Sequence, residues 1–376
     1  MNNPYSNELK ALKHSGRYRE RRVWNDNLID MGSNDYLGLA HKSQLHSRAC
    51  EMVSQYSNHA PKSSMLVNGY HPIHQNFERA LCDANGFEAG IVMGSGFNAN
   101  IGLIECLVRK GDVLLMDEQY HASGIMATKM CEGEVIFFPH NDASALEKLI
   151  KDATKKRIVV AVEGIYSMGG DLLSREILSV CERYGVLVIL DEAHSSGVIG
   201  KNLMGILDYY DIASTPLMIK MGTLGKAYGS FGAYVLCSKH IEEYLINRAK
   251  NVIYATAPSL YDTALAHQAL MFIGENCTTL SQHIQSHQQI VREILGVEMV
   301  GLILPIEIGD NVIAMEIQQI LKDDLGVSVG AIRQPTVKKA ILRVIFRISA
   351  EKETVVRVCE RLKFLKSVAL EDYKGL

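Results

Sequence analysis

Short apolar runs alternate with helical patterns between residues 41 and 265. One such helical pattern spans 142–153, where Leu146, Leu149 and Ile150 share a face behind Asp142, which can cap the helix. This alternation is typical of βαβ units and predicts an α/β fold with a mainly parallel central sheet and helices on both faces. The expected strands are 90–93, 113–116, 135–138, 158–162, 186–190, 217–221 and 233–236.

The pattern changes after residue 265 and predicts a second, smaller α+β domain. Helical residues continue to Leu295; they are followed by a strand at 302–306, a helix at 312–325, a strand at 341–348 and a helix from Ala350. A chain of 376 residues also exceeds what one core usually holds. We therefore expect an N-terminal arm (1–40), a large domain (41–265) and a small C-terminal domain (266–376).

Composition narrows the classes of partner. A hydrophobic content of 47% argues against disorder, and a net charge of -3 gives no electrostatic reason to bind nucleic acid. The eight cysteines are scattered without zinc-type spacing, and no segment resembles a leader or a membrane span. We expect a cytoplasmic protein with reduced cysteines, no metal site and small-molecule substrates.

Two of the apolar runs end in groups that carry chemistry. The 186–190 run leads into Asp191 and His194, and the 217–221 run leads into Thr223 and a glycine-rich turn containing Lys226. Ligands of open α/β sheets bind at the carboxyl ends of the strands, where these groups would converge. A carboxylate, an imidazole, a hydroxyl and an amine suit an aldehyde cofactor with a pyridinium ring and a phosphate. Pyridoxal 5'-phosphate is the candidate.

Two other interpretations of this stretch are weaker. Asp-Glu-Ala-His at 191–194 matches a helicase box, but such a protein also needs a Gly-x-x-x-x-Gly-Lys-Ser/Thr phosphate loop, and none occurs. Lys226 is instead followed by Ala227. A lone Gly-Lys turn is a common surface feature, so only the combination of groups favours a cofactor site.

Three further strand ends carry candidate residues. Gly96 and Phe97 open a helical pattern after the 90–93 run, where backbone amides at a helix N-terminus can bind a phosphate. His121 follows the 113–116 run and would either cap a helix or stack on a planar cofactor. Ser167 follows the 158–162 run and would either bond its own backbone or reach the same site.

Two arginine features lie outside this region. The run 17–22 contains four arginines, and it is either a solvated helix face or an anion-binding group. Arg343 lies on an apolar strand, where it either reaches water at the rim or binds the carboxylate of an amino acid.

These motifs together resemble the α-oxoamine synthases, which are fold-type I pyridoxal-phosphate enzymes. The resemblance covers nearly the whole chain and rests on the segments 33–38, 94–97, 121–123, 163–168, 191–197, 223–226 and 254–256. It implies a homodimer in which Lys226 forms a Schiff base with the cofactor and Asp191 pairs with the pyridine nitrogen. It further implies that His194 and Ser167 approach the ring hydroxyl, that His121 stacks on the ring, and that Gly96, Phe97, Thr223 and the other subunit's Thr256 hold the phosphate.

The resemblance also implies the substrate contacts. Arg343 matches the arginine that binds the amino-acid carboxylate, and the other substrate-binding positions are Asn34, His121, Thr336 and Arg19, with Arg17 and Arg21 as alternatives to Arg19. The catalytic set is Lys226, His121 and Asp191.

The segment 331–337 resembles the biotin-pathway branch of the family, which joins L-alanine to a pimeloyl thioester carried by coenzyme A or acyl carrier protein. The segment 60–65 departs from the glycine-rich sequence usual in the family, which leaves the acyl donor open. Three alternatives remain: a glycine-using sister enzyme with an acetyl or succinyl donor, a synthase of a signalling α-aminoketone, and a catalytically silent scaffold of the same fold.

Overall fold

The computed structural model describes residues 3–15, 17–21, 23, 25, 27–153 and 157–372, with side chains to residue 365. Arg22 of the basic run lies outside the described residues. The chain forms two compact units, a large one (Asp35–Ser167 and Asp171–Ile284) and a small one (Met1–Asn34, Met168–Gly170 and Gln285–Leu376). The three-part division expected from the sequence, with boundaries at 40 and 265, stays a prediction.

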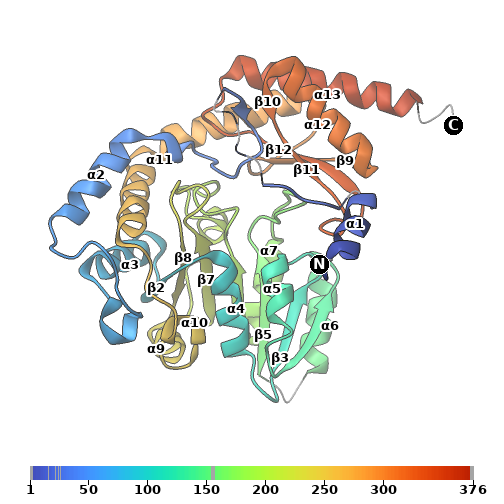
Figure 1. The fold of residues 1–376 in the computed structure, drawn as a ribbon. Helices are drawn as coiled ribbons and strands as arrows, with labels where there is room; N and C mark the ends of the chain where they lie inside the picture. Colours follow the sequence, from blue (N-terminus) through green and yellow to red (C-terminus); the bar gives the residue numbers. More distant parts are fainter. Residues whose placement is uncertain are drawn as a thin grey trace. The chain divides into compact units, whose positions relative to one another are not determined.

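The large unit contains a seven-stranded sheet in the order β2-β8-β7-β6-β5-β3-β4 (Figure 1). Only β8 runs antiparallel to its neighbours, so the prediction of a mainly parallel sheet is confirmed. Every apolar run forms one strand: β2 (Ala89–Met93), β3 (Val113–Asp117), β4 (Glu134–Phe138), β5 (Ile158–Glu163), β6 (Leu187–Asp191), β7 (Met218–Thr223) and β8 (Ala233–Cys237).

Helices cover both faces of this sheet, as the burial of its strands shows: apart from the edge strand β4, every strand residue is buried except Ile158 and Thr223, which are partly buried. On one face, α4 packs against β2, β7 and β8. The expected cap of α6 is confirmed, since the Asp142 carboxylate accepts a hydrogen bond from the backbone of Ala145. The helices of this unit are α2 (Ser43–Ser54), α3 (Pro72–Asn85), α4 (Gly96–Leu107), α5 (Ala122–Ala127), α6 (Ala143–Asp152), α7 (Arg175–Tyr184), α8 (Ile206–Tyr210), α9 (Lys239–Arg248), α10 (Lys250–Ile253) and most of α11 (Leu260–Leu295), with short turns η1 (Leu39–His41) and η2 (Met65–Gly69).

The small unit has the α+β pattern expected for the C-terminal part. Its three-stranded antiparallel sheet has the order β11-β12-β9, formed by Gly330–Ile332, Ala340–Ile345 and Ile303–Gly309, and a parallel pair joins β1 (Ile29–Asp30) to β10 (Val327–Ser328). The helices are α1 (Ser6–His14), α12 (Asn311–Leu325) and α13 (Lys352–Asp372). Residues 17–21 follow α1 in irregular backbone, so the expected helix is wrong, although four of the five residues are exposed as expected for a solvated run.

Long helices occur in the described chain, including α11 and α13, but none combines the length and the apolar character needed to cross a bilayer.

Candidate active site

Four parallel strands of the large unit end in polar residues at one edge of the sheet. Asp117, Glu163, Asp191 and Thr223 are the last residues of β3, β5, β6 and β7. Glu163 and Asp191 are direct partners in the β5–β6 ladder. The parallel topology therefore gathers side chains that are up to about a hundred residues apart, as the strand-end rule predicts.

Lys226 lies just beyond this edge and is paired with a histidine. Its Nζ is 2.8 Å from His194 Nε2. The other ring nitrogen, His194 Nδ1, is 2.5 Å from the Tyr36 hydroxyl. The structure thus brings together the amine and the imidazole singled out from the sequence, and adds Tyr36, whose side chain is fully buried.

Asp191 is buried and held by two donors. Its carboxylate is in a residue only 4% exposed, and it accepts hydrogen bonds from Asn100 Nδ2 at 2.8 Å and from the Ala193 backbone at 3.0 Å. Asn100 in turn accepts from the Tyr120 hydroxyl at 2.8 Å. Both of these donors are neutral groups that fix the position of the carboxylate. The carboxylate can therefore still pair with a protonated ring nitrogen.

His121 caps α5 and is linked to Asp191 through two polar side chains. The Ser123 hydroxyl donates to His121 Nδ1 at 2.7 Å and accepts from Asn100 Nδ2 at 2.9 Å. The Ser123 backbone N–H points at the same Nδ1 at 3.3 Å. Burial lowers the pKa of His121, and nearby Lys226 lowers it further against the opposing effect of Asp191. A neutral imidazole with Nδ1 as acceptor carries its proton on Nε2.

Glu163 is a second buried carboxyl beside Asp191. It accepts the Ser167 backbone N–H at 3.0 Å through Oε2, while its Oε1 is buried without a hydrogen-bond partner among the described residues. Burial and the neighbouring charge of Asp191 raise the pKa of Glu163 well above its ordinary value. The backbone of Ser167 is thereby held beside this second buried carboxyl group.

The expected anion site is a helix N-terminus next to Thr223. Helix α4 begins at Gly96, and Ser95 Oγ caps it by accepting from the backbone of Asn98. A Cβ placed on Gly96 would lie 3.6 Å from Thr223 Cβ and 3.8 Å from its Oγ1. The hydroxyl of Thr223 and the amides of Gly96 and Phe97 therefore occupy one neighbourhood, where the helix dipole favours an anion.

Thr256 occupies a different environment. It is exposed and pairs through its backbone with Ser64, and the neighbouring Ala257 donates to the Ser63 carbonyl. Its assignment to the phosphate of another subunit stays a prediction.

Four of the five expected substrate residues belong to the small unit and form two pairs, whereas His121 belongs to the large unit. Arg343 Nη1 donates to Asn34 Oδ1 at 2.9 Å, and Arg19 Nη2 lies 3.5 Å from Thr336 Oγ1. Arg343 is only 6% exposed, so its interpretation as a rim residue with its head in water is wrong. A guanidinium group presents its donors in a fixed fork that matches the geometry of a carboxylate.

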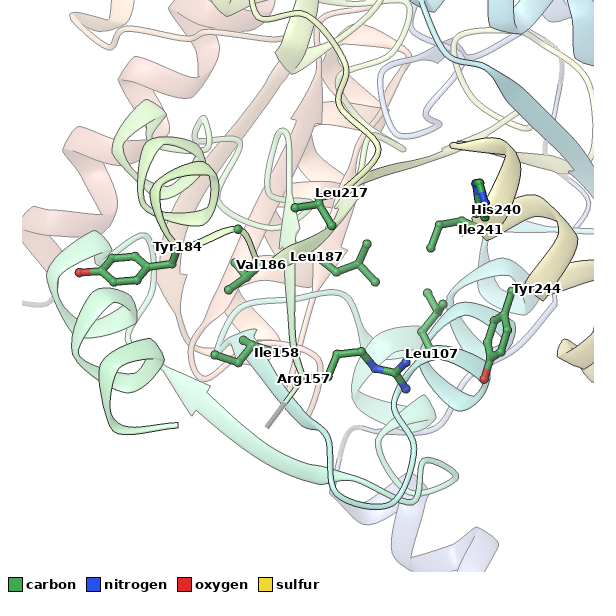
Figure 2. A pocket seen from close by; sticks show the side chains of 11 residues that line it. Leu107, Arg157, Ile158, Tyr184, Val186, Leu187, Leu217, His240, Ile241 and Tyr244 are labelled. Atoms are coloured by element: carbon green, nitrogen blue, oxygen red, sulfur yellow. The ribbon is translucent and has the colours of Figure 1, made fainter. Parts of the chain in front are cut away.

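The hollow drawn in Figure 2 is not this site. It measures about 490 Å³ and is lined mainly by apolar side chains, including Ile158, Leu187 and Leu217. These residues begin or precede β5, β6 and β7, whereas Lys226 follows the opposite, carboxyl end of β7. The hollow therefore lies at the far end of the strands.

Four residues of the site were missed as functional groups by sequence reasoning: Asn100, Ser123, Glu163 and Tyr36. Glu163 had a readable signal, because it directly follows a buried apolar run. Asn100 and Ser123 lie within helices and carried no such signal.

The residues of the large unit fit a group with three binding features. Lys226 offers an amine for a carbonyl, buried Asp191 offers a negative charge for a ring nitrogen, and the start of α4 with Thr223 offers donors for an anion.

Comparison with known proteins gives consistent results. The model of the family "Aminotransferase class I and II" matches residues 26–362. The 8-amino-7-oxononanoate synthase of Helicobacter pylori (strain ATCC 700392 / 26695) is 42% identical over 342 residues, covering 90% of this chain and 91% of that protein. The enzyme of the same name from Geobacter sulfurreducens is 33% identical and covers 91% and 92% of the two chains.

Solved structures agree on the fold. An 8-amino-7-oxononanoate synthase from Francisella tularensis superposes with a TM-score of 0.77 at 25% identity, covering 93% of this chain and 100% of that one. A serine palmitoyltransferase from S. paucimobilis, solved with bound PLP and myriocin, superposes with a TM-score of 0.87 at 21% identity, covering 97% and 98%.

Proposed function

The chain belongs to the class I and II aminotransferase family and, within it, to the α-oxoamine synthases, and from this membership we propose that it is an 8-amino-7-oxononanoate synthase. The reaction is the condensation of L-alanine with a pimeloyl thioester, giving 8-amino-7-oxononanoate, carbon dioxide and a thiol, in biotin biosynthesis. The fold is that of fold-type I pyridoxal-phosphate transferases. The observation that carries the proposal is the Lys226–His194 pair beside buried Asp191 at the carboxyl ends of adjacent parallel strands.

Pyridoxal 5'-phosphate, when bound, supplies an electron sink for negative charge at the amino acid's α-carbon. Asp191 would keep the ring nitrogen protonated, which is what makes the ring an effective sink. The Lys226 amine would hold the cofactor through its aldehyde group and would also be the base that takes the substrate's α-proton. Gly96, Phe97 and Thr223 would bind the phosphate.

The environment of His121 suggests a hydrogen-bonding role. Because His121 Nδ1 accepts from Ser123, its Nε2–H is the donor available to a carboxylate or thioester oxygen. His194 and Ser167 would bind the ring hydroxyl, and His121 would stack on the ring.

We propose that Arg343 binds the carboxylate of L-alanine, with Asn34, Thr336 and Arg19 as further substrate contacts. The expected effect of Arg343→Lys is an increase of about 10- to 100-fold in KM for L-alanine, because a charged hydrogen-bonding fork is lost and such bonds contribute about 1.5–3 kcal/mol. We expect kcat to change by only a few-fold. Steady-state kinetics with varied L-alanine measures both parameters.

Arg357→Lys is the matched control for this substitution, since Arg357 is an exposed arginine on α13 of the same unit. Equal KM values for the two variants would show that Arg343 does not contact the carboxylate.

A homodimer is the proposed assembly, with Thr256 reaching the phosphate bound by a second copy. Its support is a set of exposed apolar side chains near Thr256 in the large unit. Val67 on η2 is 75% exposed and Tyr254 is 77% exposed, and η2 packs against α10, which directly precedes Tyr254. Apolar groups gathered in this way mark association surfaces.

Thiol release by the purified, cofactor-loaded protein tests the function. L-alanine, glycine and L-serine are each paired with pimeloyl, acetyl and succinyl thioesters on coenzyme A and on acyl carrier protein. We expect release with L-alanine and a pimeloyl donor only. Release with glycine and a short donor would replace the proposal with a sister activity, and a colourless preparation that takes up no cofactor would favour the silent scaffold.

A further inference from the structure

His140 lies between two carboxylates, near the carboxyl ends of β3 and β4. Its Nδ1 is 3.0 Å from Asp117 Oδ1, and its Nε2 is 2.8 Å from Asp171 Oδ2. Its ring stands edge-on to that of Tyr166, with centroids 4.4 Å apart. His140 follows β4, Asp117 ends β3, and Asp171 lies beyond β5, so a single imidazole joins three segments of the sheet edge.

The charge of this imidazole follows from its neighbours. Burial acts to lower the pKa of His140, but the hydrogen bonds and charges of Asp117 and Asp171 outweigh it and raise the pKa to about 10. The third titratable group facing the ring is the Tyr166 hydroxyl, which donates to Asp117 Oδ2 at 2.8 Å. His140 is therefore an imidazolium at neutral pH.

The Asp117 end of this bridge fixes the turn that carries His121. Besides His140, the Asp117 carboxylate accepts from the backbones of Gln119 at 2.8 Å and Asn141 at 2.9 Å. The Asp117 carbonyl accepts from the backbone of Tyr120, the residue before His121. The path from Asp117 to His121 is thus folded around the carboxylate that His140 neutralises.

The other end of the bridge fixes the turn that carries Ser167. Tyr166, the residue before Ser167, is tied to Asp117 through its hydroxyl, and its backbone N–H donates to the Asp171 carbonyl at 3.0 Å. The carboxylate of the same Asp171 binds His140. If His140 were replaced by an uncharged residue, the carboxylates of Asp117 and Asp171 would repel each other. These two residues anchor the turns that carry His121 and Ser167.

We propose that His140 is a positioning residue: by bridging Asp117 and Asp171 it fixes the His121 and Ser167 turns relative to each other and so sets their contacts with the cofactor ring. The consequence for catalysis rests on the proposed function, whereas the consequence for the position of His121 is a property of the protein alone.

The test compares His140→Gln with Asp208→Asn in the full chain. Asp208 is a matched structural control, because its carboxylate also caps a turn in the large unit, accepting from Asn202 and Met204. We expect His140→Gln to shift the visible absorption maximum of the bound cofactor, to weaken cofactor affinity about tenfold and to lower kcat about tenfold, as groups behind a site typically do. KM for L-alanine should change little.

A second readout needs no cofactor. The ring signals of the 13 histidines are followed by NMR after labelling the histidine Cε1 carbons. We expect the His121 signal to move in His140→Gln and not in Asp208→Asn. We also expect the His140 signal to titrate near pH 10 in the unsubstituted protein, and its stabilising effect to be complete below about pH 6.5 and lost as the pH rises toward 10.

An unmoved His121 signal, or a His140 that titrates near pH 6.5, would overturn the inference. So would cofactor spectra and affinities that are the same in the two variants. A protein that takes up no cofactor but shows the His121 displacement would instead contradict the proposed function and leave the positioning role supported.

Discussion

Lys226→Ala is expected to lower kcat for thiol release by roughly 10⁴-fold, the upper range for loss of a general base, to which loss of the covalent anchor adds. The Nζ of Lys226 is the amine paired with His194 at 2.8 Å, and alanine leaves nothing at that point to hold a carbonyl or to accept the substrate's α-proton. Exchange of the L-alanine α-proton with solvent deuterium measures the proton transfer directly. Borohydride reduction followed by peptide mass analysis measures the attachment.

The control for this substitution is Lys201→Ala, which removes an exposed lysine of the same unit. We expect it to retain thiol release, α-proton exchange and cofactor attachment. If Lys226→Ala kept thiol release within tenfold of the unsubstituted protein, or if borohydride attached the cofactor to another lysine, the assignment of Lys226 would be wrong.

The central sheet could be predicted because burial on both faces produces apolar runs that are legible in a single sequence. The one strongly polar side chain within these runs, Lys220, did not disturb the prediction of β7. Its Nζ is buried and donates to Asn85 Oδ1 at 2.7 Å and to the Met204 carbonyl. The short strands β1, β10 and β11 could not be predicted, because elements of two or three residues exist only through their partners in the fold.

The candidate site was predictable to the extent that its groups follow strands. Asp191, His194 and Lys226 follow buried runs, and parallel topology then requires them to lie at one edge. Asn100 lies within α4 and reaches Asp191 only because that helix packs on the sheet. His140 lies past the end of the edge strand β4, and its two carboxylate partners are 23 and 31 residues away in sequence. No local pattern encodes such a bridge.

Asp191→Asn is expected to lower kcat by about 10²- to 10³-fold with little change in KM for L-alanine, which is the cost typical of losing one preorganised electrostatic contact in a transition state. An amide cannot hold the ring nitrogen protonated. It also cannot replace both existing contacts, because the carboxylate accepts from Asn100 on one oxygen and from Ala193 on the other. Either orientation of the new amide would place its NH₂ group against one of these donors.

The measurement that separates these effects is α-proton exchange combined with thermal unfolding. Loss of a hydrogen bond alone would lower stability, as Asp208→Asn should do by removing a turn cap, without slowing exchange. Asp191→Glu supplies the complementary arm: it restores the negative charge at an altered distance, so partial recovery of exchange would indicate that charge is the property required. Exchange in Asp191→Asn as fast as in Asp208→Asn would remove Asp191 from the catalytic set, because the charge at the end of β6 would then have no part in acidifying the substrate.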